Sequence, residues 1–289
     1  MDNNPTPGGR RPHPLERRPL PPAPPDPSTP ARPRIRVELP TVTPLVTYAL
    51  IAINVAVFLL RALSPEIDED IYLWGANIPS LVVSGEYYRL LTSMFLHASI
   101  YGFRGDFAFS NSIHILFNMF VLYGVGRQIE PVFGHARFAL IYLLGGLMGS
   151  VFSAVFREGG GGSVGASGAV FAVIGAELIY LYRHRELLGA AAQAQMRSLL
   201  VWGFLNLALG ALGSTFGSGM RIDNWGHLGG LAGGLALAWL IAPIFQPRPS
   251  PREPTALIAE DANPLSRRVW VLFAYALVLI AILAFASAR

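Results

Sequence analysis

The 289-residue sequence contains no cysteine and no lysine, and only 14% of its residues are charged. The absence of cysteine excludes disulfides, thiolate metal sites and a cysteine nucleophile. Soluble domains typically carry about 25% charged residues. The low charge, together with 52% hydrophobic residues, indicates that lipid is the main solvent of this chain. The composition therefore predicts an integral membrane protein.

Apolar runs of about 20 residues are the signature of membrane-spanning helices, because this length of helix crosses the hydrocarbon core. Such runs, or slightly shorter ones, cover residues 45–60, 113–126, 138–156, 167–182, 199–213, 225–245 and 269–286. We therefore expect an all-α polytopic membrane protein. A six-helix bundle occupies residues 41–245, and a Pro-rich linker at 246–267 leads to a seventh transmembrane helix within 268–289.

The basic charge of the chain, +4 at pH 7, comes entirely from arginine. Residues 1–40 are rich in proline and arginine and hold few apolar residues, so we expect a disordered tail. Most other arginines lie in short segments beside the apolar runs, where they orient a membrane protein rather than bind nucleic acid. Their bias predicts a cytoplasmic N-terminus and a C-terminus on the outer side.

The first polar cluster with chemical potential lies at the outer start of the fourth run, where the sequence reads Gly165-Ala166-Ser167-Gly168. Glycines beside a serine allow a tight loop-to-helix turn and leave the hydroxyl accessible. Small residues at helix interfaces are also ordinary packing in membranes. The motif alone is therefore compatible with both a nucleophile and a packing contact.

The second cluster lies at the outer start of the sixth run and contains His227 between Gly226 and Gly230. Histidine is costly in a membrane, and its ordinary pKa near 6.5 suits a general base. A structural histidine bonded to a loop carbonyl is the alternative. Since the intervening run returns outward, both Ser167 and His227 are expected at similar depth near the outer face.

The third cluster is His114 and Asn118 in the second run. Residues four apart share a helical face, so both side chains point the same way at the depth of Ser167. Donors there could stabilise the oxyanion of a tetrahedral intermediate, together with the Ser167 backbone amide. Interhelical hydrogen bonding is the alternative role for Asn118.

Other intramembrane protease chemistries lack their residues in this sequence. There is no His-Glu-x-x-His motif for a metalloprotease, and the seven runs contain no aspartate for an aspartyl protease. Serine chemistry is the hydrolytic option whose parts are present, and we expect neither a metal nor a cofactor.

Together, the three clusters resemble the rhomboid family of intramembrane serine proteases, over roughly residues 45–245. The resemblance implies that Ser167 is the nucleophile and His227 the base, without a third acid. It also implies an oxyanion site at His114, Asn118 and the Ser167 amide, with Gly165, Gly168, Gly226 and Gly230 as supporting residues. Phe171 falls where the family has an aromatic residue that stacks on the catalytic histidine, although a core aromatic is an equal alternative.

Further features are similar to structural elements of the family. Arg89 belongs to an aromatic-arginine element in the first loop, and Glu130 and Gly134 form a Glu-x-x-x-Gly element after the second run. One departure is the stretch between His97 and His114, which is longer than usual and suggests an insertion at residues 98–112. We hypothesise that this insertion is a surface loop that alters substrate access.

The resemblance implies an endopeptidase that cleaves single-pass transmembrane proteins through an acyl-enzyme, with the lipid bilayer as its other partner. We expect an integral protein of a bacterial plasma membrane. The main alternative is an inactive rhomboid-like protein that binds membrane clients, but such a protein would be expected to lack Ser167 or His227. A transporter or channel is a weaker alternative, because internal repeats and charges deep in several runs are not seen.

Overall fold

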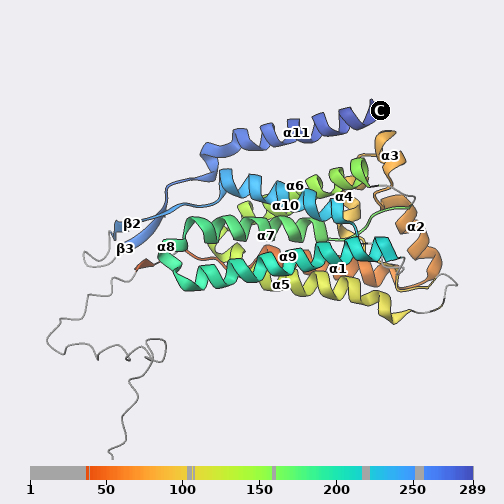
Figure 1. Ribbon diagram of the computed structural model, residues 1–289, viewed down its shortest axis with the longest axis horizontal. Coiled ribbons are helices and arrows are strands. Elements are labelled where there is room, and N and C mark those ends of the chain that lie inside the picture. The colour runs from red at the N-terminus through yellow and green to blue at the C-terminus, as the bar shows by residue number, and fades with distance from the viewer. Residues whose placement is uncertain are drawn as a thin grey trace, which may run out of the picture. The chain divides into compact units, whose positions relative to one another are not determined.

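The computed structural model describes residues 37–38, 40–102, 106, 108–157, 161–216, 222–250 and 257–288. These residues are mostly helical, and a three-stranded sheet lies at one end of the helices (Figure 1). Residues 1–36 of the expected tail lie outside the described residues, whereas Val37–Glu38 form strand β1.

The long helices follow the apolar runs, and most of the short helices lie between the first two runs. The long helices are α1 (Leu45–Arg61), α5 (Ile113–Phe133), α6 (His135–Phe156), α7 (Ser167–Arg183), α9 (Ala190–Phe216), α10 (Asn224–Ile241) and α11 (Val269–Ser287). The short ones are α2 (Pro65–Gly75), α3 (Pro79–Val83), α4 (Arg89–Thr92), α8 (Arg185–Leu188), and the 3-10 helices η2 (Ser93–Phe95), η3 (Phe109–Ser112) and η4 (Leu265–Arg268).

Two described helical segments are long and apolar enough to cross a membrane by themselves. They are His135–Phe156 and Leu265–Ser287, and the apolar helix Leu45–Arg61 is shorter. The second of these segments contains α11, the expected seventh helix, whose residues are largely exposed. The total of seven spans stays a prediction from the sequence.

Helix α5 is longer than the sequence predicts, because it continues from Gly126 to Phe133. Its last turns hold Glu130, whose buried carboxylate accepts hydrogen bonds from the Val46 and Thr47 amides at 2.8 and 2.7 Å and from the Thr47 hydroxyl at 2.6 Å. An acid at this position satisfies amides at the start of α1 that have no intrahelical acceptor. Gly134, with φ +78°, then turns the chain into α6.

The sixth run was predicted to end at Phe245, but α10 ends at Ile241. Pro243 explains the correction, since the residue before a proline is pushed out of the helical region, and Ala242 is extended with ψ 146°. Phe245 instead begins strand β2 (Phe245–Pro249).

The expectation of an all-helical chain is wrong in the linker at residues 246–267. Strand β2 pairs antiparallel with β3 (Leu257–Asp261), and β1 pairs parallel with β3 on its other side. The sheet therefore joins the segment before α1 to the segment before α11. Arg137 on α6 anchors it through Asp261, with 2.6 Å between Nη2 and Oδ2.

Small residues set the spacing of the central helices, where α10 packs against both α6 and α7. A Cβ atom on Gly230 would lie 2.0 Å from the Gly168 carbonyl oxygen, and one on Gly234 would lie 2.0 Å from the Ala172 carbonyl oxygen. Glycine alone permits this approach of two backbones. Gly230 and Gly234 lie four residues apart in the sequence, so they share the face of α10 that packs against α7.

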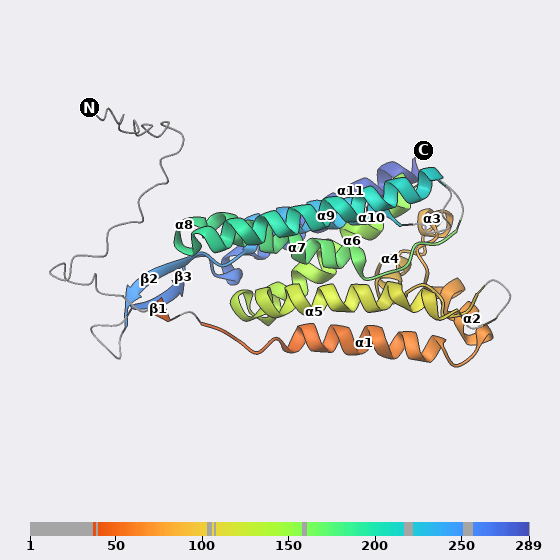
Figure 2. The ribbon, with the colours of Figure 1, turned by 60° about the horizontal axis from the view of Figure 1, so that its bottom comes forward.

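The segment between α1 and α5 forms a cap of short helices. Figure 2 shows α2 and α3 at the end of the long helices opposite to the sheet. Buried Arg89 holds this segment together, because its guanidinium donates to the Leu73 and Ala76 carbonyls at 2.7 and 3.1 Å and to the Glu86 carboxylate at 2.7 Å.

Candidate active site

Ser167 is the first residue of α7 and follows a turn that requires glycine. Gly165 has φ +138°, and its amide donates to the Ser93 carbonyl at 3.0 Å. A two-way backbone pair between Asn77 and Ser163, at 3.0 and 2.9 Å, ties the preceding residues to the same cap. The turn therefore holds a half-buried Ser167 at the start of a helix, with its position fixed from the N-terminal side.

His227 lies in the first turn of α10 and is buried, with 5% of its surface exposed. Asp223 caps this helix by accepting a hydrogen bond from the Gly226 amide at 2.9 Å. A Cβ on Gly168 would lie 3.2 Å from the Gly226 carbonyl oxygen. Because Ser167 precedes one of these glycines and His227 follows the other, α7 and α10 bring both residues to one backbone contact.

The imidazole of His227 is oriented by an aromatic ring. Phe171, one turn after Ser167, stacks on it with ring centroids 4.4 Å apart and an interplanar angle of 14°. Trp202 of α9 contacts the same phenyl ring at 5.5 Å. The His227 Nδ1 atom is buried and has no hydrogen-bond partner among the described residues. The ring is therefore held by stacking rather than by an acid at Nδ1.

His114 faces the same turn from α5. Its Nδ1 accepts a hydrogen bond from the Ala98 amide at 3.2 Å, so the proton of the neutral ring is on Nε2. A Cβ on Gly165 would lie 3.1 Å from this Nε2 and 3.6 Å from the Ser167 Oγ. A donor from His114 and the Ser167 hydroxyl thus flank one point beside Gly165.

Asn118 is placed differently. Its side-chain amide donates to the His114 carbonyl at 2.8 Å, one turn earlier on α5. One of its two N–H groups is therefore used within its own helix, which leaves the other for a partner.

The segment predicted as an insertion contacts the site directly, because Ala98 is its first residue. Within it, the Gly102 amide donates to the Asp106 carbonyl and the Ala108 amide to the Ile100 carbonyl, at 2.6 and 2.8 Å. Residues 103–105 and 107 lie outside the described residues. The segment at residues 98–112 therefore begins with the contact that fixes the His114 ring.

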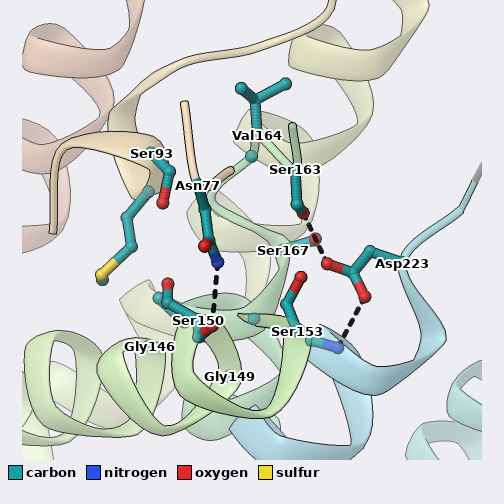
Figure 3. A pocket seen from close by; sticks show the side chains of 15 residues that line it. Asn77, Ser93, Gly146, Gly149, Ser150, Ser153, Ser163, Val164, Ser167 and Asp223 are labelled. Atoms are coloured by element: carbon teal, nitrogen blue, oxygen red, sulfur yellow. Dashed lines mark hydrogen bonds between the residues drawn. The ribbon is translucent and has the colours of Figure 1, made fainter. Parts of the chain in front are cut away.

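A small polar pocket opens beside Ser167 (Figure 3). Its walls come from the cap of short helices, from α6, from the turn before α7 and the start of α7, and from the start of α10. Its lining includes four residues that the sequence predicts for the site, namely Ser167, Gly165, Gly168 and Gly226. His227, His114 and Asn118 are not in its lining.

Several polar residues of the pocket were missed by the sequence search. They include Asn77, Ser93, Ser150, Ser153, Ser163 and Asp223. Four of them, Asn77, Ser93, Ser163 and Asp223, lie in the connections between the apolar runs, where polar residues are ordinary. Ser150 and Ser153 lie within the third run, but they belong to no catalytic motif. Asp223 carried a recognisable signal, because an aspartate directly before a helix is a preferred N-cap.

The site defines a class of protein: a mainly helical bundle with a serine and a histidine at one glycine-lined contact between two helices. A model of the rhomboid domain matches residues 84–244. The chain therefore belongs to the rhomboid family, whose members are integral membrane proteins and include serine proteases. This match confirms the resemblance found in the sequence.

Individual relatives agree with the family assignment. The chain is 34% identical over 197 residues to the rhomboid protease GluP of Bacillus subtilis, covering 68% of this chain and 34% of the relative. It is 34% identical over 204 residues to RHOMBOID-like protein 1 of Arabidopsis thaliana, covering 68% and 47%. RHOMBOID-like protein 5 of the same plant is 31% identical over 259 residues, covering 76% and 77%. The chain thus spans about a third to a half of the length of the first two relatives.

Proposed function

We propose that this protein is an intramembrane serine endopeptidase that cleaves transmembrane segments of single-pass membrane proteins through a Ser167–His227 dyad. The observation that carries the proposal is the contact of α7 with α10 at Gly168 and Gly226, beside which both residues lie. The stacking of Phe171 on His227 supports it, since the ring is held in one orientation. No cofactor takes part in the proposed reaction.

In the proposed reaction, the Ser167 Oγ attacks the scissile carbonyl carbon while His227 takes the hydroxyl proton. The tetrahedral intermediate then collapses, the C–N bond breaks, and His227 gives the proton to the leaving amine. Water attacks the resulting ester, again losing a proton to His227. Breakage of the ester bond releases the new carboxyl terminus, and His227 returns the proton to Ser167.

The oxyanion of each intermediate requires donors on the side of the carbonyl oxygen. We assign this role to the Ser167 amide, the His114 Nε2 and the remaining N–H of Asn118. Amides in the first turn of a helix have no intrahelical acceptor, so the Ser167 N–H is available for an anion. The tautomer fixed by Ala98 supplies the second donor.

We propose that the dyad lies near the outer face of a bacterial plasma membrane with the N-terminus in the cytoplasm, and the arginine bias supports this orientation. Water for deacylation would then enter from the outer side. The polar lining of the pocket beside Ser167 fits this route, because its hydroxyl and amide groups can bind water.

The test uses the purified full chain in detergent with a fluorescently labelled single-pass substrate. We expect cleavage by the wild type and none by Ser167→Ala or His227→Ala. A fluorophosphonate probe should label the wild type at Ser167 and fail to label either variant. Equal cleavage by wild type and Ser167→Ala would reject the dyad, and binding of the substrate without cleavage would instead favour an inactive client-binding protein.

A further inference from the structure

Asp223 joins the two halves of the site through its two carboxylate oxygens. Oδ1 accepts from the Gly226 amide at 2.9 Å, in the first turn of the helix that carries His227. Oδ2 accepts from the Ser163 hydroxyl at 2.5 Å, in the segment that leads to Ser167. Both hydrogen bonds are drawn in Figure 3, and Asp223 and Ser167 line the same pocket.

The segment that contains Ser163 is also bonded to the cap of short helices. The Ser163 backbone forms two hydrogen bonds with Asn77, and Gly165, two residues later, is bonded to Ser93. The segment before Ser167 is therefore fixed to the cap of short helices by its backbone and to α10 by the Ser163 side chain. A hydrogen bond to a carboxylate is stronger than one between neutral groups, so it can hold the segment before Ser167 to α10.

The geometry argues against Asp223 as the third member of a Ser-His-Asp triad. In such a triad the acid accepts a hydrogen bond from Nδ1 of the histidine. Here both Asp223 oxygens are used by Ser163 and Gly226, and the His227 Nδ1 has no partner among the described residues. A role as the N-cap of α10 does not account for both hydrogen bonds of Asp223 either, since capping needs only one carboxylate oxygen.

We propose that Ser163 and Asp223 form a latch that fixes the separation of Ser167 from His227, so that Asp223 is a positioning residue for the dyad. The inference rests on the proposed function. If the Ser163–Asp223 hydrogen bond is lost, the turn before α7 stays bonded to the cap of short helices. It is then no longer bonded through Ser163 to the start of α10, the helix that carries His227. The nucleophile and the base can then drift apart while the fold persists.

The test compares Ser163→Ala, Asp223→Asn and the double variant in the full chain. An asparagine keeps one acceptor oxygen for the helix cap, but its side-chain amide can meet the Ser163 hydroxyl only as a donor, so the hydrogen bond to a carboxylate is lost. We expect each single variant to lower kcat and the rate of fluorophosphonate labelling of Ser167 by about tenfold, since an ångström of misplacement can cost more than this. KM should stay within about twofold. The double variant should be no worse than the more damaging single one, because both remove the same connection.

Two further variants separate positioning from stability. Ser163→Thr keeps the hydroxyl and should restore labelling to within about twofold of the wild type. Ser64→Ala removes a helix cap at α2, where the Ser64 Oγ accepts from the Ile67 amide, and should lower the melting temperature without changing labelling. If Ser163→Ala does not yield folded protein, Ser163→Cys replaces it, because a thiol is a weaker donor than a hydroxyl. Its rate of fluorophosphonate labelling should lie between those of the wild type and Asp223→Asn.

The latch is rejected if Ser163→Ala labels at the wild-type rate, or if the losses in Ser163→Ala and Asp223→Asn multiply in the double variant. A loss in Asp223→Asn alone would mean that the charge of Asp223, and not its hydrogen bond to Ser163, supports the reaction, and would also reject the latch. These outcomes differ from failure of the proposed function, in which the wild type itself neither cleaves substrate nor reacts with the probe.

Discussion

Substitution of Gly230 by alanine is the most direct perturbation of the helix contact that carries the site. The added Cβ would lie 2.0 Å from the Gly168 carbonyl oxygen, whereas ordinary van der Waals contact begins near 3.4 Å. The obstacle is backbone on both sides, so α7 and α10 must separate by about 1.4 Å to accept it. A misplacement of about 1 Å can cost a factor of 10² in rate. We therefore expect Gly230→Ala to lower kcat at least about a hundredfold.

The assay is cleavage of the labelled transmembrane substrate, with fluorophosphonate labelling of Ser167 as a second readout. Gly124→Ala on α5 is the matched control, because a Cβ there meets nothing within 4 Å. Alanine favours a helix over glycine by about 1 kcal/mol, so the control should be at least as stable as the wild type and as active. If Gly230→Ala cleaves within about twofold of the wild type, the contact of α7 with α10 does not set the dyad geometry.

Three further predictions concern neighbouring interactions. Phe171→Leu should lower kcat up to about tenfold, because a stacked ring contributes about 0.5–1.5 kcal/mol to holding His227; unchanged kinetics would leave Phe171 as a core residue only. Glu130→Gln should lower the free energy of unfolding by about 2 kcal/mol, since its amide would face donors, whereas Glu186→Gln on the exposed surface of α8 should leave the melting temperature unchanged. Burial, aided by nearby histidine and arginine charges, lowers the pKa of His97 to about 3. The unfolded chain therefore takes up a proton near pH 6.5 that the folded chain excludes. Stability should fall as the pH drops from 6.5 towards 3, and His97→Gln should flatten the dependence of melting temperature on pH.

The location of the candidate site could be predicted because it depends on features that are local in the sequence. Ser167 and His227 each lie at the start of an apolar run of the same direction, which predicts similar depth although they lie 60 positions apart. Glycines at every fourth position of the later run predict a bare helix face, and the structure packs that face against α7. Helical periodicity and the alternating direction of successive runs are therefore sufficient to predict where the candidate site lies and which face of the later helix is packed.

Element ends were harder to predict, because they depend on partners distant in the sequence. The end of α5 was expected at Gly126, but the polar turn beyond it is stabilised by Glu130 through its bonds to the start of α1. The sheet was not expected at all, since β1 pairs with a strand more than 200 residues later. The end of α10 was an avoidable error, because Pro243 marks it in the sequence.

The latch was missed for a different reason. Polar residues in the membrane are energetically costly, so those in the apolar runs and at their starts indicate function. Asp223 and Ser163 lie just outside the runs, where a serine or an aspartate is ordinary. Their significance comes from the distance between them in space, which no local pattern contains.

The structure also shows how a histidine can be oriented without a triad acid. In a Ser-His-Asp triad the carboxylate fixes both the direction and the tautomer of the imidazole through Nδ1. His227 has no partner at Nδ1 among the described residues, and its ring instead lies against Phe171 on a helix that glycines hold close to α7. Orientation by packing depends on shape rather than charge. Substitutions that change the helix spacing, such as Gly230→Ala, should therefore slow the reaction more than Asp223→Asn, which removes the nearby negative charge.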